Sequence, residues 1–129
     1  MAVGDGELVF SLRLHQLGFW LVAPVQVFGF RELEMVLDTG SPANSLSKSV
    51  LAALLDRKLI RPTSSQLGRR PTYLLSNASV EEQALPDLEV YLSNRVSMLP
   101  IDGILGLAFL SQFRHVALDV PTLRLTLRS

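Results

Sequence analysis

The sequence contains no cysteine. Disulfide bonds and thiol catalysis are therefore excluded, and the redox state of the compartment cannot be read. Only His15 and His115 offer an imidazole, and no Cys/His spacing typical of a metal site occurs. The glycines also form neither a phosphate loop nor a dinucleotide fingerprint. We therefore expect no metal and no cofactor.

The sequence also lacks an excess of charge of either sign. Twelve lysines and arginines balance twelve aspartates and glutamates, so the formal net charge is zero. Proteins that bind nucleic acid usually carry a basic surplus, and we expect no nucleic-acid partner. A net charge near zero does little to oppose self-association.

Long hydrophobic runs are absent. The most apolar early segment, 19–28, is interrupted by Pro24 and Gln26. It is far shorter than the about 20 residues that span a bilayer. Residues 1–6 are small and acidic, unlike the basic start of a signal peptide. We therefore expect no membrane association and a cytoplasmic location. The length of 129 residues predicts one domain over 1–129.

Short apolar segments separated by turn residues predict a mostly β fold with one or two short helices. Ser47 is a candidate helix cap, and the apolar residues after it share one helical face up to Pro62. Residues 107–113 have a short helical periodicity. The predicted strands are 8–14, 25–28, 33–37, 72–75, 80–85, 88–92, 96–99, 116–120 and 123–127.

The segment 35–41, Met-Val-Leu-Asp-Thr-Gly-Ser, is the strongest motif. Its apolar start predicts a buried strand, and Gly40 permits a tight turn after it. The strands 25–28 and 33–37 would form a hairpin that brings Asp38 to its end. A carboxylate at the edge of a core is costly unless partners hold it. Asp-Thr-Gly alone is also a common turn, so the motif by itself leaves a purely structural role open.

Two such loops facing each other could perform acid–base chemistry. Two close carboxylates share a proton, so one can act as general base towards water and the other as general acid towards a carbonyl oxygen. The Thr39 hydroxyl could bond across to the facing loop, and Gly40 would let backbone approach the carboxylate. Ser41 could donate to an outer oxygen of Asp38. The chain carries this motif once.

A second apolar motif lies downstream. Ile104-Leu105-Gly106 is followed by the helical segment 107–113, and the whole run 102–110 is similar to bacterial retropepsin-like proteins. Together with 35–41, and in the same order, it resembles the retropepsin-like aspartic proteases over residues 19–127. The resemblance implies a single-lobe acid-protease fold, a closed barrel, with Ile104-Leu105-Gly106 beneath the catalytic loop.

The resemblance also implies a homodimer in which each chain lends one Asp38 to the catalytic pair. An extended peptide or protein substrate would lie between this pair and a flap hairpin. We expect the flap at 72–85, with its turn at Ser76, Asn77 and Ala78 and with Tyr73 within reach of a ligand. This stretch departs from the family because it has no glycine at its tip.

The implied function is an aspartic endopeptidase, with Asp38 as the catalytic acid and base. Thr39, Gly40 and Ser41 would support it. Asp102 and Asp119 are the other candidate acids, and their neighbours favour turns instead. The alternative function is a non-catalytic dimerisation or peptide-binding module. Leu107-Ala108 stand where retroviral members carry an arginine followed by Asn or Asp, so the dimer would be built differently.

Overall fold

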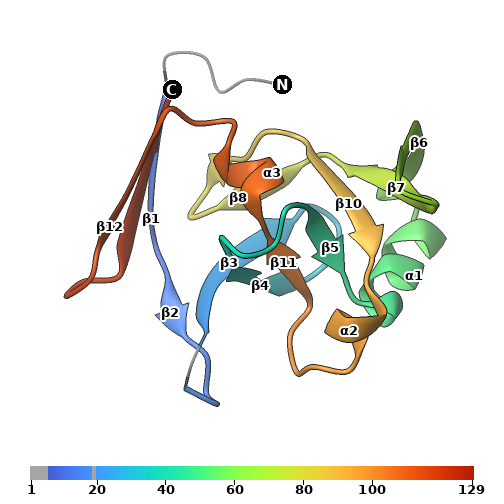
Figure 1. The fold of residues 1–129 in the computed structure, drawn as a ribbon, viewed down its shortest axis with the longest axis horizontal. Helices are drawn as coiled ribbons and strands as arrows, with labels where there is room; N and C mark the ends of the chain where they lie inside the picture. The colour runs from blue at the N-terminus through green and yellow to red at the C-terminus, as the bar shows by residue number, and fades with distance from the viewer. Residues whose placement is uncertain (1–5, 19) are drawn as a thin grey trace.

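The computed structural model describes residues 6–18 and 20–129. The expectation about a signal peptide rests mainly on residues 1–5, and these lie outside the described residues, as does Phe19. Strands dominate the described chain, so the mostly β prediction is confirmed (Figure 1). The strands are β1 (Glu7–Ser11), β2 (Arg13–Leu14), β3 (Leu21–Val27), β4 (Glu32–Leu37), β5 (Asn44–Leu46), β6 (Ile60–Leu67), β7 (Arg70–Leu75), β8 (Ala78–Val80), β9 (Gln83–Ala84), β10 (Leu88–Leu92), β11 (Gly103–Leu105), β12 (His115–Asp119) and β13 (Arg124–Arg128).

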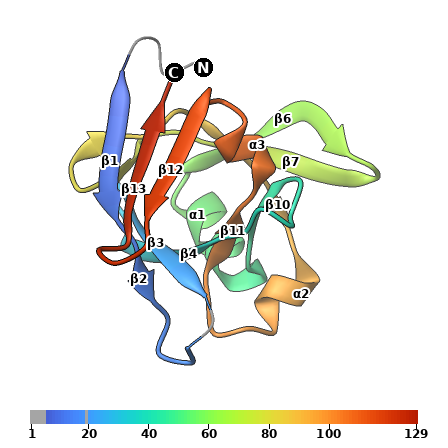
Figure 2. The same cartoon turned by 60° about the vertical axis from the view of Figure 1, so that its left-hand side comes forward.

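The strands form two sheets. The larger, 10-stranded sheet has the order β6-β7-β10-β5-β11-β4-β3-β8-β9, with β2 paired to β3. The smaller sheet has the order β1-β13-β12 and stands beside it (Figure 2). In the described chain neither sheet pairs its first strand with its last, so the predicted closed barrel is wrong. The N-terminal strand and the C-terminal hairpin pair with each other and leave the edges of the larger sheet apart.

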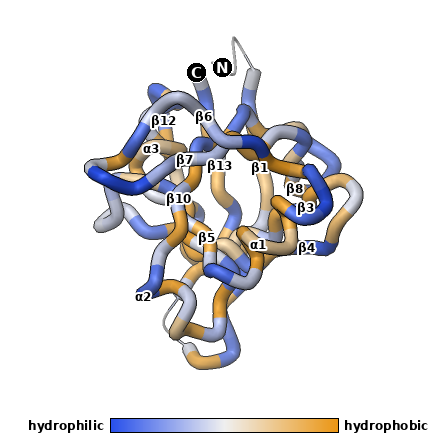
Figure 3. The backbone as a smooth tube through the Cα atoms, turned by 90° about the vertical axis from the view of Figure 1, so that its right-hand side faces the viewer, coloured by the Kyte–Doolittle hydropathy of each residue, from blue (hydrophilic) through white to orange (hydrophobic). Residues whose placement is uncertain are grey.

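One apolar core joins the two sheets. Phe10 and Leu125 contribute from the smaller sheet, Leu33 and Leu88 from the larger one, and all four are at most 1% exposed. Figure 3 shows hydrophobic segments along the inner strands, while the tip of the β6–β7 hairpin is hydrophilic. The β3–β4 and β12–β13 hairpins predicted from the sequence are both present.

Three helices complete the described chain: α1 (Lys48–Asp56), α2 (Asn94–Ser97) and α3 (Leu107–Leu110). The sequence predicted one or two, because 96–99 was read as a strand. Instead, Ser93 Oγ accepts the Val96 N–H at 3.1 Å and caps α2. The longest helix has nine residues, so the described part of the chain holds no helix able to span a bilayer.

The helix α1 begins where the sequence predicts. Ser47 Oγ accepts the Val50 N–H at 3.4 Å, which satisfies one of the unpaired donors of the first turn. The helix ends at Asp56, because Lys58 has a left-handed φ of 58° and the Leu59 N–H bonds back to Leu54 O at 2.9 Å.

The hairpin in this part of the chain lies earlier than predicted. Strand β6 pairs antiparallel with β7, and the turn contains Gly68 with φ 61°. Strand β8 pairs with β3 instead of β7, and Asn77 O accepts the Phe28 N–H at 3.2 Å. The hairpin predicted around 76–79 is therefore wrong. Residues 60–67 were not recognised as a strand because most of them are polar and exposed, and they form a sheet edge with little to bury.

We expect Leu54→Ala to lower the free energy of unfolding by about 2–5 kcal/mol, because it leaves a cavity in the core. Leu54 is 0% exposed, whereas its neighbour Leu55 is 37% exposed on the other face of α1. Leu55→Ala is the matched control and should cost about 0.5 kcal/mol. Chemical denaturation of both variants checks this. Equal losses would show that α1 does not pack as described.

Candidate active site

Asp38 stands directly after β4, where the chain turns towards β5. Its side chain is half-buried, and both carboxylate oxygens accept a hydrogen bond. The Gly40 N–H donates to Oδ1 at 2.8 Å, and Ser41 Oγ donates to Oδ2 at 2.8 Å. The Ser41 N–H donates to Asp38 O at 3.2 Å and closes the turn. The loop thus holds its own carboxylate in one orientation, and Thr39 remains exposed at its tip.

Strand β11 supports this loop from below. It lies between β4, to which it is parallel, and β5, to which it is antiparallel. The Asp38 N–H donates to Leu105 O at 3.0 Å, and the Gly106 N–H donates to Asn44 Oδ1 at 3.0 Å. The Ile104-Leu105-Gly106 element therefore lies where the resemblance implied.

Gly106 allows the loop to sit on β11. A Cβ at this position would collide with the carbonyl oxygens of Ser41 and Ala43. The first residues of α3 also bond to the loop. The Leu107 N–H donates to Ser41 O at 2.8 Å, and the Ala108 N–H donates to Pro42 O at 2.9 Å. The loop is consequently bonded at one end to β11 and at the other end to the start of α3.

A cleft of about 510 Å³ opens beside the Asp38 carboxylate. One wall is the small apolar cluster around Val36, Val96 and Ile101, against which Trp20 and Ile104 pack. The lining residues are Trp20, Leu21, Val36, Leu37, Asp38, Ser41, Pro42, Ala43, Ser45, Tyr91, Ser93, Arg95, Val96, Leu99, Ile101 and Ile104. Asp38 is the only acidic residue among them, so a single carboxylate faces a cleft that has both apolar and polar walls.

Trp20 is held in this wall by His15. The two rings meet edge to face, with centroids 5.3 Å apart. His15 Nε2 lies 3.0 Å from Pro100 O, and its Nδ1 accepts the Leu17 N–H at 3.2 Å. Leu99, which follows α2, packs against the same apolar cluster as Trp20.

The hairpin β6–β7 reaches the same region. Its tip, with Leu67, Gly68 and Arg70, lines a second hollow of about 420 Å³ that shares Tyr91 and Arg95 with the cleft. Arg70 Nη1 donates to Leu92 O at 3.0 Å, and the Arg70 guanidinium lies 5.5 Å from the centroid of the Tyr91 ring. The tip of this hairpin therefore lies next to the cleft, although none of its residues lines the cleft itself.

The residues predicted for the flap lie elsewhere. Tyr73 is on β7 and packs against the main core. Ala78 is 3% exposed and pairs with Val27, while Ser76 and Asn77 connect β7 to β8. None of the four lines the cleft at Asp38. No sequence pattern pointed to Trp20, Tyr91, Arg95 or the tip of β6–β7, although Gly68 within a polar stretch was an available signal for a turn.

The other candidate acids have structural partners. Asp102 accepts two bonds from the Arg31 guanidinium, both at 3.0 Å, and the Glu34 N–H at 2.7 Å. The hydrogen bond to Asp102 is the main cause that raises the pKa of Arg31. Asp119 accepts the Thr122 hydroxyl at 2.9 Å in the turn before β13. Among residues 6–18 and 20–129, no group of three His, Asp or Glu side chains could hold a metal ion.

Comparison with known proteins shows what this chain resembles. Its sequence matches no protein-family model and no curated protein. Its fold is similar to the crystal structure of a retropepsin-like aspartic protease from Rickettsia conorii, with a TM-score of 0.61 and 18% identity. The match covers 95% of this chain and 90% of that one. At this identity the similarity establishes the fold: the chain has a retropepsin-like fold.

We expect Gly106→Ala to lower the free energy of unfolding by about 1–3 kcal/mol, because the added methyl group overpacks the contact with the loop. Gly40→Ala is the comparison, since its Cβ would lie 3.1 Å from a single side-chain atom, Asp38 Oδ1, and would meet no backbone. In a thermal unfolding experiment it should cost less stability than Gly106→Ala. A stable Gly106→Ala variant would contradict the described support of the loop.

Proposed function

We propose that the protein is an aspartic endopeptidase that acts as a homodimer and hydrolyses peptide bonds between two Asp38 carboxylates. The observation that carries this proposal is the Asp38 loop itself. Gly40 and Ser41 orient a half-buried carboxylate, which faces a cleft. The loop that carries it is bonded to β11. A connecting turn can also fix an aspartate in this way, but it has no need of the cleft beside the carboxylate.

The second carboxylate has to come from another molecule. Asp38 is the one acid that lines the cleft. Asp102 is bonded to Arg31 and to the Glu34 N–H, and Asp119 is bonded to Thr122 in its own turn. With two loops face to face, one carboxylate takes a proton from a water molecule while the other gives a proton to the carbonyl oxygen. The exposed Thr39 would lie at the contact between the loops.

The proposed substrate is an extended peptide bound along the cleft. The wall formed by Trp20, Val36 and Ile104 suits a large apolar side chain next to the scissile bond. The hairpin tip at Gly68 would cover the peptide from the other side and supply backbone hydrogen bonds. Arg95 adds a positive charge to the rim of the cleft.

The alternative, a non-catalytic dimerisation or peptide-binding module, was suggested by a flap without glycine. The hairpin beside the cleft has Gly68 in its turn, so this argument no longer applies. No other feature of the described residues favours the module over the protease.

Asp38→Asn should reduce peptide cleavage by roughly 10²–10⁴-fold or more, because the amide cannot exchange a proton with water. Its isosteric side chain should leave the fold unchanged. Asp56→Asn, at the exposed end of α1, is the control and should cleave like the parent. Mass spectrometry of a peptide library digested from acidic to neutral pH would measure both. Parental cleavage by Asp38→Asn would overturn the proposal.

Adding inert Asp38→Asn protein to the parent should lower the activity of the parent, because mixed dimers contain one working carboxylate. Activity of the parent alone should rise more steeply than its concentration near the dissociation constant. Initial rates at fixed parent concentration and increasing variant concentration provide the measurement. Activity that is proportional to parent concentration and insensitive to the variant would mean that one chain is sufficient.

A further inference from the structure

The two edges of the smaller sheet differ in how they are covered. Side chains from the β8–β9 region cover the edge of β1: Gln83 bonds both the N–H and the C=O of Val9, at 3.2 and 2.7 Å. Glu81 Oε2 accepts the Ser11 N–H at 2.8 Å. The edge of β12 has no such cover, and in the described chain no strand pairs with it. An open strand edge is a template for pairing with another chain.

The hydrogen-bond alternation identifies which backbone groups face this edge. The Leu12 N–H donates to Leu123 O at 2.8 Å, so the odd-numbered residues of β13 bond towards β1. The even-numbered residues of β13 bond towards β12, where the register pairs them with odd-numbered residues. The N–H and C=O groups of Val116 and Leu118 therefore point to the open edge.

The side chains of the same two residues are apolar and exposed. Val116 is 46% exposed, Leu118 is 36% exposed, and Val120 just beyond the strand is 67% exposed. Their neighbour on the same face of β13, Leu127, is fully buried. The apolar face of the sheet thus continues past its last strand into solvent.

We propose that a second copy of this chain docks on β12, by antiparallel pairing of β12 with itself about Ala117. In this register Val116 lies opposite Leu118 of the second copy, and each such pair exchanges N–H···O=C bonds in both directions. The pairing joins the two smaller sheets into one continuous sheet and brings the exposed apolar side chains together. It specifies the partner surface for the homodimer, and to that extent it rests on the proposed function.

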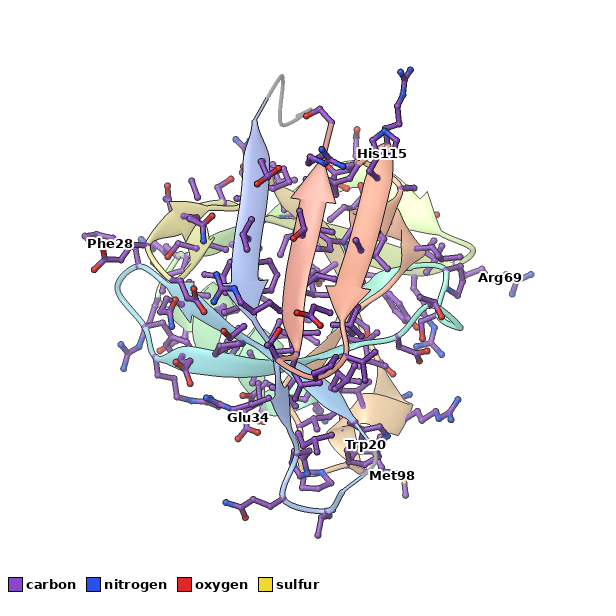
Figure 4. All side chains as sticks on the ribbon, turned by 90° about the vertical axis from the view of Figure 1, so that its left-hand side faces the viewer. Trp20, Phe28, Glu34, Arg69, Met98 and His115 are labelled. Atoms are coloured by element: carbon purple, nitrogen blue, oxygen red, sulfur yellow. The ribbon has the colours of Figure 1, made fainter. Side chains whose placement is uncertain are left out.

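Polar complementarity favours this partner and this register. His115 opens β12, as Figure 4 shows, and Asp119 ends it. Self-pairing about Ala117 places His115 opposite Asp119 of the second copy, in a pair whose side chains approach closely. Two imidazole–carboxylate contacts related by the twofold axis result.

The open edge also lies on the side of the molecule that a shared active site requires. In Figure 2, β12 is the strand of its sheet nearest to α3, whose first residues bond to the Asp38 loop. A dimer joined along β12 therefore has the Asp38 loop on the same side as its contact, which is compatible with two loops that face each other.

Leu118→Pro tests the pairing directly. It removes an outward N–H and leaves the bonds between β12 and β13 intact, as proline requires at a sheet edge. We expect the dissociation constant of the dimer, measured by analytical ultracentrifugation, to rise roughly tenfold or more through the lost bonds. Val116→Lys should act similarly, and it decides the matter if circular dichroism shows that the proline variant does not fold. Phe28→Lys, an 81% exposed position far along the chain, is the control and should dimerise like the parent.

The register has its own test. His115→Glu and Asp119→Lys should each weaken the dimer, and the double variant should recover most of the parental dissociation constant. A parent that dimerises while all β12 variants associate equally well would overturn this inference and leave the protease proposal standing. A parent that dimerises through β12 but cleaves no peptide would overturn the protease proposal alone. A parent that is monomeric at every concentration would overturn this inference, and the protease proposal too if that monomer cleaves peptides.

Discussion

The site depends on one contact, the packing and hydrogen bonding of the Asp38 loop against β11 and Gly106. Gly106 brings the carbonyl groups of Ser41 and Ala43 against the strand, and Leu105 accepts the Asp38 N–H. Because β11 is paired on both sides, to β4 and to β5, the loop cannot shift without breaking the centre of the larger sheet. The orientation of the carboxylate is therefore a property of the whole sheet and not of the loop alone.

The sequence predicts the parts of the molecule that are buried. The apolar residues before Asp38, the helix after Ser47 and the Ile104-Leu105-Gly106 element carry patterns because each packs against the core. These elements support the loop, so the position of Asp38 at the end of a buried strand could be predicted from the sequence. The pairing of β11 with β4 and β5 could not be predicted. These strands are far from β11 along the chain, and they pair through backbone groups that every residue has.

Two of the wrong predictions concern the edges of the sheets. Strand β6 is almost entirely exposed, so it has no alternation of apolar and polar residues to reveal it. The flap was consequently assigned to the more apolar 72–85, which belongs to two different pairings. Closure of a barrel likewise depends on which edge strands pair. Here β1 pairs with β13, from the other end of the chain, and the two form a separate sheet with β12.

The indole of Trp20 has a practical value that follows from its place in the wall of the cleft. It is the only tryptophan of the chain, so its ultraviolet emission arises from one site. Its contact with His15 and its partial exposure make that emission sensitive to whatever displaces water from the cavity. The molecule therefore contains an optical reporter of occupancy, readable without a label and without turnover.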